Sequence, residues 1–97
     1  MSYTVTISSQ ADNDIRAIYE YIAFTLMSPE NADAQISRFQ NRIESLDNMP
    51  KRFPIYKNSI RYMPVDNYLV FYSVDENQKT VSILRVMYGK RDVKNNI

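Results

Sequence analysis

The first half of the chain carries two runs of hydrophobic residues at the spacing of α-helices. The apolar stripe of the first run consists of Ile15, Ile18, Tyr19, Ile22 and Leu26. The stripe of the second run consists of Ala32, Ile36, Phe39, Ile43 and Leu46. These stripes predict helices at about residues 10–26 and 29–47. Because almost no chain separates the two helices, they must form an antiparallel hairpin, which needs a sheet to cover its apolar faces.

Residues with a preference for helix termini mark where both helices begin. Ser9, followed by Asp12 three residues later, fits a capping box at the start of the first helix. Ser28 is a favourable N-cap for the second helix, and Pro29 suits the first turn because its missing N–H is not needed there. The sequence therefore predicts N-caps at Ser9 and Ser28.

A short N-terminal segment and the C-terminal half of the chain follow the two-residue alternation of half-buried strands. The inward residues of the first strand, predicted over residues 3–8, are Tyr3, Val5 and Ile7. The later strands are predicted over residues 60–63, 68–74 and 80–88, with short loops that make them an antiparallel meander. The expected fold is α+β in the order β-α-α-β-β-β, with the antiparallel sheet packed against the N-terminal helical hairpin in a single domain, residues 1–97.

Prolines limit the short strand on both sides. Residues 48–58 contain two prolines and are predicted to form a connecting loop. Pro64 must end the strand at 60–63 or place it at an edge, because proline donates no ladder hydrogen bond. The basic residues of the loop, which form either a binding cluster or a solvated loop, are Lys51, Arg52 and Lys57.

The residue types that are missing exclude several classes of chemistry. The chain has no Cys and no His, which excludes disulfides, thiolate nucleophiles, His–Cys zinc sites and Ser–His triads. We therefore expect no metal and no cofactor, and any acid–base chemistry must use Asp, Glu, Lys or Tyr. No segment approaches the ~20 apolar residues of a membrane span, and the start lacks the basic and apolar pattern of a signal peptide. The expected location is the cytoplasm.

The net charge of +1 conceals an asymmetry between the two halves of the chain. Residues 1–50 hold three basic side chains against seven acidic ones, a net charge of −4. Residues 51–97 hold nine basic side chains against four acidic ones, a net charge of +5. A basic second half suggests a face directed at an anionic partner, with ordinary solvated charge as the alternative.

Arg85 lies in the middle of the last predicted strand and is the first candidate for a functional cation. Strict alternation places it on the same face as Ile83 and Met87. The residues of the opposite face are then Leu84, Val86 and Tyr88. Arg85 either lines a functional groove or pairs with a carboxylate such as Asp75 or Glu20.

Further candidates surround the exit of this strand. Lys90 and Arg91 follow Gly89, the only glycine of the chain, which is expected to free the backbone at this point. The Lys-Arg pair either binds phosphate or an acidic protein, or it is a solvated strand exit. Tyr88 either stacks on a base or donates a proton, or it belongs to the core. Arg61, on the short strand, either joins the other cations across the sheet or keeps an edge strand soluble.

Three segments together resemble one known superfamily. The segment VSILRVMYGKRD, residues 81–92, resembles the last strand of RelE/ParE toxins, in which an apolar strand with an Arg runs into a Gly-(Lys/Arg)-Arg-(Asp/Glu) exit. YLVFYSVD, residues 68–75, resembles their central strand, and IRAIYEYI, residues 15–22, resembles the helical hairpin of the ParE-type branch, the plasmid stabilisation proteins. The resemblance covers nearly all of residues 3–93. It implies a sheet with the hairpin packed on it, and a toxin that a cognate antitoxin wraps and silences.

The resemblance implies one of two actions. RelE-type members are ribosome-dependent messenger-RNA endonucleases, whereas ParE-type members are associated with poisoning of DNA gyrase. The RelE-type pattern matches Arg91, beside Lys90, but Leu69 stands where it has a second Arg, and Asn-Asn-Ile at residues 95–97 stands where its catalytic Tyr would fall. Many ParE-like sequences have His where this chain has Tyr88. These departures favour the ParE-type action.

The sequence therefore predicts a growth-inhibiting toxin that binds and poisons gyrase. The alternatives are an enzyme, a metal-independent mRNA interferase (an endoribonuclease), and a regulatory module that binds DNA only through its antitoxin. The expected partners are the antitoxin and either gyrase or the ribosome with mRNA, without any membrane. The expected target-binding residues are Arg85, Lys90 and Arg91. If the chain is a ribonuclease, the catalytic candidates are Arg61, Arg85, Tyr88, Lys90 and Arg91.

Overall fold

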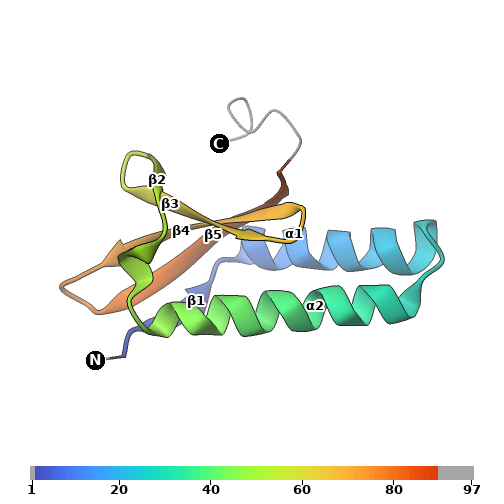
Figure 1. The fold of residues 1–97 in the computed structure, drawn as a ribbon, viewed down its shortest axis with the longest axis horizontal. Helices are drawn as coiled ribbons and strands as arrows, with labels where there is room; N and C mark the ends of the chain where they lie inside the picture. Colours follow the sequence, from blue (N-terminus) through green and yellow to red (C-terminus); the bar gives the residue numbers. More distant parts are fainter. Residues whose placement is uncertain (1, 90–97) are drawn as a thin grey trace.

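The fold is described by a computed structural model that covers residues 2–89. Its helical elements are α1 (Ser9–Glu20), the π-helical turn η1 (Tyr21–Thr25), α2 (Pro29–Glu44) and the 3-10 turns η2 (Ser45–Asp47) and η3 (Pro50–Arg52). Its strands are β1 (Thr4–Ile7), β2 (Ile55–Lys57), β3 (Ile60–Val65), β4 (Tyr68–Asp75) and β5 (Thr80–Tyr88). The two helices lie side by side along one face of the sheet (Figure 1). The predicted α+β fold, with a helical hairpin before the meander, is confirmed.

The five strands form one mixed sheet in the order β1-β5-β4-β3-β2. β3, β4 and β5 are antiparallel neighbours, as the meander predicts. β1 departs from the predicted antiparallel sheet because it pairs parallel to β5, from Thr4 beside Thr80 to Ile7 beside Ile83. Local alternation does not reveal this pairing, since it reports the face of a residue and not the partner of its strand.

A short strand replaces part of the predicted loop. β2 pairs with β3 through Ile55 and Lys57, and the Tyr62 N–H donates to the Pro54 carbonyl at 3.2 Å. Backbone nitrogens two residues apart on a strand point to the same side, so the nitrogen of Pro64 faces the side on which Tyr62 meets Pro54. The short strand β2 does not extend as far as Pro64. Proline is tolerated there because no partner strand needs the missing N–H. Pro64 therefore lies at an open edge, one of its two predicted positions.

The core lies between α2 and the sheet. Its buried residues are Ala11, Phe39, Ile43, Leu46, Met63, Val65, Val70, Tyr72, Val81, Ile83 and Val86. Phe39, Ile43 and Leu46 confirm the predicted stripe of the second helix. Ile7 was expected to face inward but is 49% exposed, because it is the last residue of an edge strand.

Both helices begin at serines, but the first predicted cap is displaced by one residue. Ser8, not Ser9, caps α1, because its Oγ accepts a hydrogen bond from the Ala11 N–H at 3.0 Å. The same hydroxyl donates to the Leu84 carbonyl at 3.0 Å and so ties the start of α1 to β5. Ser28 is the N-cap of α2, as predicted, although its side chain makes no capping bond.

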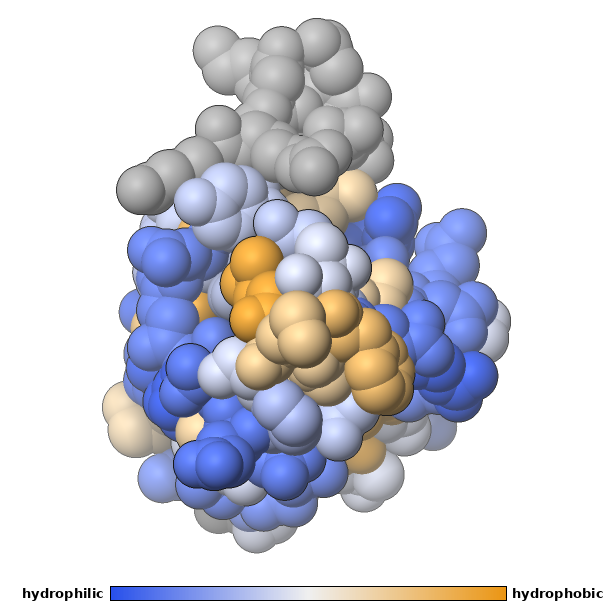
Figure 2. Space-filling model, turned by 90° about the vertical axis from the view of Figure 1, so that its right-hand side faces the viewer, coloured by the Kyte–Doolittle hydropathy of each residue, from blue (hydrophilic) through white to orange (hydrophobic). Residues whose placement is uncertain are grey.

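A π-helical turn changes the direction of the apolar stripe at the end of α1. The Leu26 N–H donates to the Tyr21 carbonyl at 2.9 Å, five residues back instead of four. Leu26, which was predicted to continue the inward stripe, is therefore turned outward and is 55% exposed. Figure 2, which views the molecule from the hairpin end, shows apolar side chains gathered there among hydrophilic ones.

Glu76, in the turn between β4 and β5, joins three segments of the chain. Its carboxylate accepts a hydrogen bond from the Tyr3 hydroxyl at 2.6 Å and forms ion pairs with Lys51 and Lys79. Lys51 first, and then the Tyr3 hydroxyl, lower the pKa of Glu76 from 4.5 to about 2. Because folding lowers this pKa, the carboxylate stabilises the fold fully above about pH 4.5, and this contribution is lost as the pH falls through about 2.

We expect the Glu76→Gln variant to unfold at a lower temperature than the wild type at neutral pH, because glutamine cannot replace the charged carboxylate. At about pH 2 the two proteins should unfold at nearly the same temperature, because the wild-type carboxylate then loses its charge. Thermal unfolding followed by circular dichroism across this pH range measures the difference. Glu44→Gln is the matched control, since Glu44 is exposed and has no ion pair with any residue between 2 and 89. A deficit of Glu76→Gln that stays constant with pH would contradict the assignment.

Candidate functional site

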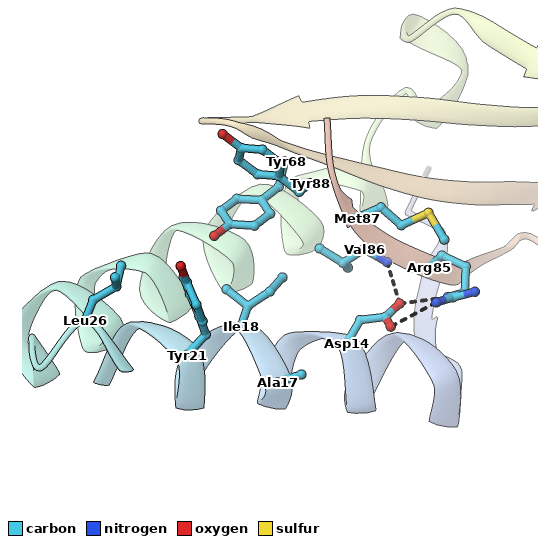
Figure 3. Close-up of a pocket in the computed structure, with 10 residues that line it drawn as sticks. All are labelled: Asp14, Ala17, Ile18, Tyr21, Leu26, Tyr68, Arg85, Val86, Met87 and Tyr88. Atoms are coloured by element: carbon cyan, nitrogen blue, oxygen red, sulfur yellow. Dashed lines mark hydrogen bonds and ion pairs between the residues drawn. The ribbon is translucent and has the colours of Figure 1, made fainter. Parts of the chain in front are cut away.

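An open groove of about 800 Å³ lies between α1 and the C-terminal end of β5 (Figure 3). Its helical side is lined by Asp14, Ala17, Ile18, Tyr21 and Leu26. Its sheet side is lined by Tyr68, Arg85, Val86, Met87 and Tyr88. Apart from Asp14 and Arg85, the lining is apolar or aromatic, which suits a binding surface.

The groove exists because β1 pairs with only the first part of β5. The ladder between the two strands ends at Ile7 and Ile83, and the chain then turns into α1. From Arg85 onward, β5 therefore faces a helix across the groove and has no strand on that side.

A β-bulge decides which side chains of β5 face the helices. Adjacent residues of β4 pair with Ile83 and Arg85, so Leu84 between them is the extra residue. Val86 then joins Ile83 in the buried core, at a spacing of three residues instead of two. The prediction that Arg85 shares a face with Ile83, opposite Val86, is therefore wrong. One inserted residue reverses the alternation, and the composition of the strand gives no sign of it.

Arg85 is bound by Asp14 of α1, not by the predicted partners Asp75 or Glu20. Its Nε and Nη2 lie 2.8 and 3.1 Å from the two carboxylate oxygens, and the Val86 main-chain N–H donates to Oδ2 at 2.9 Å. Asp14 thus supplies the acceptor that a neighbouring strand would otherwise provide to β5. The hydrogen bonds from Arg85 to this carboxylate raise the pKa of the guanidinium, which stays charged and paired.

The sequence carries a signal for Asp14 that pattern analysis missed. Asp14 lies on the face of α1 that also holds the buried Ala11 and the half-buried Ile18, three and four residues away. A carboxylate inside an apolar stripe requires a cation or several donors, and only 18% of the Asp14 side chain is exposed. Which cation of the second half meets Asp14 depends on the packing of α1 against β5.

Three aromatic rings lead from the core to the rim of the groove. Phe39 meets Tyr68 edge to face with ring centroids 5.4 Å apart, and Tyr68 meets Tyr88 in the same manner at 5.7 Å. Burial raises the pKa of Tyr68, so its hydroxyl stays protonated at neutral pH. Tyr88 is 37% exposed and is not a core residue. Its ring is available to a ligand in the groove.

Arg61 does not join the other cations. Its Nη1 donates to the main-chain carbonyl of Phe53 at 2.7 Å and to that of Lys51 at 3.2 Å. These bonds fix the segment before β2, and Arg61 does not line the groove. Its position on β3 therefore serves the fold.

The basic loop cluster is also engaged within the molecule. Arg52 donates to the Asn48 carbonyl at 2.6 Å, and Lys51 pairs with Glu76. Lys57 lies over the ring of Tyr56, with its Nζ 5.7 Å from the centroid. The basic excess of the second half is therefore less available to a partner than its count suggests.

Gly89 serves close packing. It does not adopt a positive φ, contrary to the expectation that it frees the backbone. Its N–H donates to the Asn67 carbonyl at 2.7 Å, and a Cβ at this position would lie 3.2 Å from that oxygen. A side chain at this position would therefore be tightly packed against the turn between β3 and β4, which favours glycine there. Lys90 and Arg91, both predicted target contacts, lie outside the described residues.

Two further features of the described residues bear on the kinds of site they can form. Within residues 2–89, no three acidic side chains are grouped so that they could hold a metal ion. Among these residues, every helix is too short or too polar to span a bilayer. The groove presents one guanidinium, already paired with a carboxylate, on an apolar and aromatic lining. The composition of this lining is compatible with contacts to apolar groups of a ligand.

We expect Asp14→Ala to lower the free energy of unfolding by about 1–3 kcal/mol, because it leaves Arg85 and the Val86 N–H without their acceptor. Asp12→Ala is the matched control on the same helix. Asp12 pairs with Arg16 at the surface, with 62% of its side chain exposed, and such pairs contribute only about 0.3–0.5 kcal/mol. Urea unfolding measures both variants. Equal losses would show that the Asp14 carboxylate contributes no more than a surface ion pair.

Comparison with known proteins identifies the family. The family described as "ParE toxin of type II toxin-antitoxin system, parDE" matches residues 5–93 of the chain. Among solved structures, the chain is similar to the chromosomal ParDE toxin–antitoxin system from P. aeruginosa, with a TM-score of 0.78 and 18% sequence identity over 90% of this chain and 96% of that chain. No curated protein matches the chain.

Two RelE-type structures are also similar. The toxin–antitoxin complex RelBE2 from Mycobacterium tuberculosis has a TM-score of 0.63 and 23% identity, over 91% of this chain and 99% of that chain. The archaeal RelE–RelB complex from Pyrococcus horikoshii OT3 has a TM-score of 0.64 and 21% identity, over 94% of this chain and 99% of that chain. At these identities the structures show the shared fold. Because the family match spans nearly the whole sequence, the chain belongs to the ParE toxin family of type II toxin–antitoxin systems.

Proposed function

We propose that this toxin arrests bacterial growth in the cytoplasm by binding and poisoning DNA gyrase, and that a cognate antitoxin neutralises it. Membership of the ParE family makes the chain the toxin of a type II module. The choice of gyrase over mRNA is supported chiefly by one observation, the pairing of Arg85 with Asp14.

Cleavage of RNA requires cations that stabilise the charge developing on the phosphate in the transition state. Among the described residues that line the groove, Arg85 is the one cation, and both of its contacting nitrogens are held by Asp14. A phosphate would have to displace this carboxylate or accept its repulsion. Leu69 stands where the RelE-type pattern has a second Arg. These features support action by binding.

The proposed target-binding residues are Arg85, Lys90 and Arg91. Arg85 contributes by holding the end of β5 against α1, because its guanidinium and the next main-chain N–H share the Asp14 carboxylate. Lys90 and Arg91 follow directly after Gly89 in the sequence and are proposed to contact the target. The mRNA interferase alternative would depend on the same Lys-Arg pair.

We further propose that the groove receives a segment of the antitoxin. The lining combines Ile18, Val86 and Met87 with tyrosine rings, and this composition suits the apolar face of a peptide. The three similar solved structures described above are complexes or systems of a toxin with its antitoxin. A peptide in the groove would also cover the end of β5, from which Lys90 and Arg91 continue.

Induction of this chain alone is expected to stop bacterial growth, and co-expression of the antitoxin is expected to restore it. The purified toxin should block DNA supercoiling by gyrase and leave ribosome-bound mRNA intact. In the same assay, Arg91→Ala should require at least about ten times more toxin, because a lost charge-assisted contact typically costs about 1.5–3 kcal/mol. Cleavage of ribosome-bound mRNA with gyrase unaffected would instead establish the interferase alternative.

The Ala17→Glu variant tests whether the antitoxin binds in the groove. Ala17 lines the groove and is exposed, and Glu is a good helix former, so the variant should fold. We expect its affinity for the antitoxin, measured by calorimetry, to fall at least about tenfold, because a charge enters an apolar interface. Ala34→Glu, at an exposed position of α2 outside the groove, is the control. Unchanged affinity of Ala17→Glu would place the antitoxin elsewhere.

A further inference from the structure

Four large hydrophobic side chains stand exposed at the end of the helical hairpin. Tyr21 and Leu26 are each 55% exposed, Phe24 is 72% exposed and Met27 is 83% exposed. Figure 2 shows this end of the molecule as an apolar area bounded by hydrophilic residues. We call these four residues the tip patch. A contiguous exposed apolar patch of this kind marks an interaction site.

Two main-chain hydrogen bonds close the turn that carries the tip patch. The Ser28 N–H donates to the Ile22 carbonyl at 3.0 Å, next to the bond from Leu26 to Tyr21 at 2.9 Å. Met27 between them has a φ of 54°, a left-handed conformation that costs a non-glycine residue about 1–2 kcal/mol. Glycine or asparagine would remove most of this cost. Methionine instead adds exposed apolar surface, which favours binding at the expense of stability.

The charges beside the tip patch define its partner. Glu20 and Glu30 flank the turn, both are exposed, and neither forms an ion pair with another residue in the described range 2–89. These carboxylates repel nucleic acid phosphates and attract Lys and Arg side chains. The tip patch therefore fits an apolar surface that Lys and Arg side chains of a partner protein border.

We propose that the tip patch is the surface through which the toxin docks on its protein target, in an apolar pocket bordered by basic residues. This inference rests on the proposed function and assigns separate surfaces to the two partners, the tip patch to the target and the groove to the antitoxin. Phe24 and Met27 belong to the tip patch alone, whereas Tyr21 and Leu26 also line the groove. A segment of antitoxin in the groove therefore obstructs the target at these two shared residues. Neutralisation follows from competition for space.

The test compares two double variants of the full chain. The tip variant, Phe24→Gln with Met27→Asn, changes the residues that do not line the groove. The control, Met49→Asn with Ile55→Thr, removes exposed apolar side chains just before η3 and on β2. Met49 has nearly the same left-handed φ, 51°, as Met27. Growth arrest, supercoiling by purified DNA gyrase, affinity for the antitoxin, and the oligomeric state by analytical ultracentrifugation are measured for each.

We expect the tip variant to need at least about ten times more toxin for growth arrest and for gyrase inhibition, because large apolar side chains at the centre of an interface dominate its affinity. The affinity of the tip variant for the antitoxin should stay within about twofold of the wild-type affinity, because Phe24 and Met27 do not line the groove. The control variant should match the wild type throughout. A second variant, Glu20→Lys with Glu30→Lys, should also weaken inhibition, and most strongly at low salt.

Four outcomes decide the matter. Growth arrest by the tip variant at the wild-type level would overturn the proposal. Loss of antitoxin affinity in the tip variant would show that the antitoxin binds the patch. A wild-type dimer that becomes monomeric in the tip variant would show that a second copy of the chain binds it. Either result would overturn the proposal. If the wild type arrests growth without affecting gyrase, the gyrase target fails, whereas weaker growth arrest by the tip variant then still supports docking on another basic protein.

Discussion

The hydrogen-bond ladder between β1 and β5 ends at Ile7 and Ile83, and the position of the groove follows from that limit. Beyond it, β5 presents main-chain groups that no strand satisfies, and such groups need other partners. The chain that leaves β1 supplies them from side chains. Ser8 donates to the Leu84 carbonyl, and Asp14 accepts from the Val86 N–H. α1 is thus joined to β5 by two polar side chains, and the groove lies along this joint.

The carboxylate of Asp14 also determines the chemistry of the groove. It satisfies a main-chain donor and pairs with Arg85 at the same time, so the one described cation of the lining is neutralised. The remaining lining is apolar and aromatic, and the edge-to-face contacts of Tyr68 with Phe39 and Tyr88 continue it into the core. A surface of this composition gains binding energy by excluding water from apolar side chains. It is poorly suited to holding a phosphate.

The uneven charge of the chain acquires a spatial meaning in the fold. The acidic first half forms the hairpin, whose end carries Glu20 and Glu30 beside exposed apolar residues. Many basic residues of the second half are used internally, since Arg61 and Arg52 bind main-chain carbonyls and Lys51 pairs with Glu76. An acidic hairpin suits a basic protein partner better than a nucleic acid. The target and the antitoxin would meet neighbouring surfaces that share Tyr21 and Leu26.

The sequence by itself determined the helical hairpin, the meander and the N-cap at Ser28, because periodicity and terminal preferences report local geometry. The buried stripe that contains Phe39 followed from the same signal. The parallel pairing of β1, the bulge at Leu84 and the bond from Arg85 to Asp14, 71 residues apart, were decided only by the tertiary structure. Strand pairing and ion pairing between distant segments depend on how whole elements pack. The local sequence pattern reports which face of an element is buried, but not which distant element it packs against.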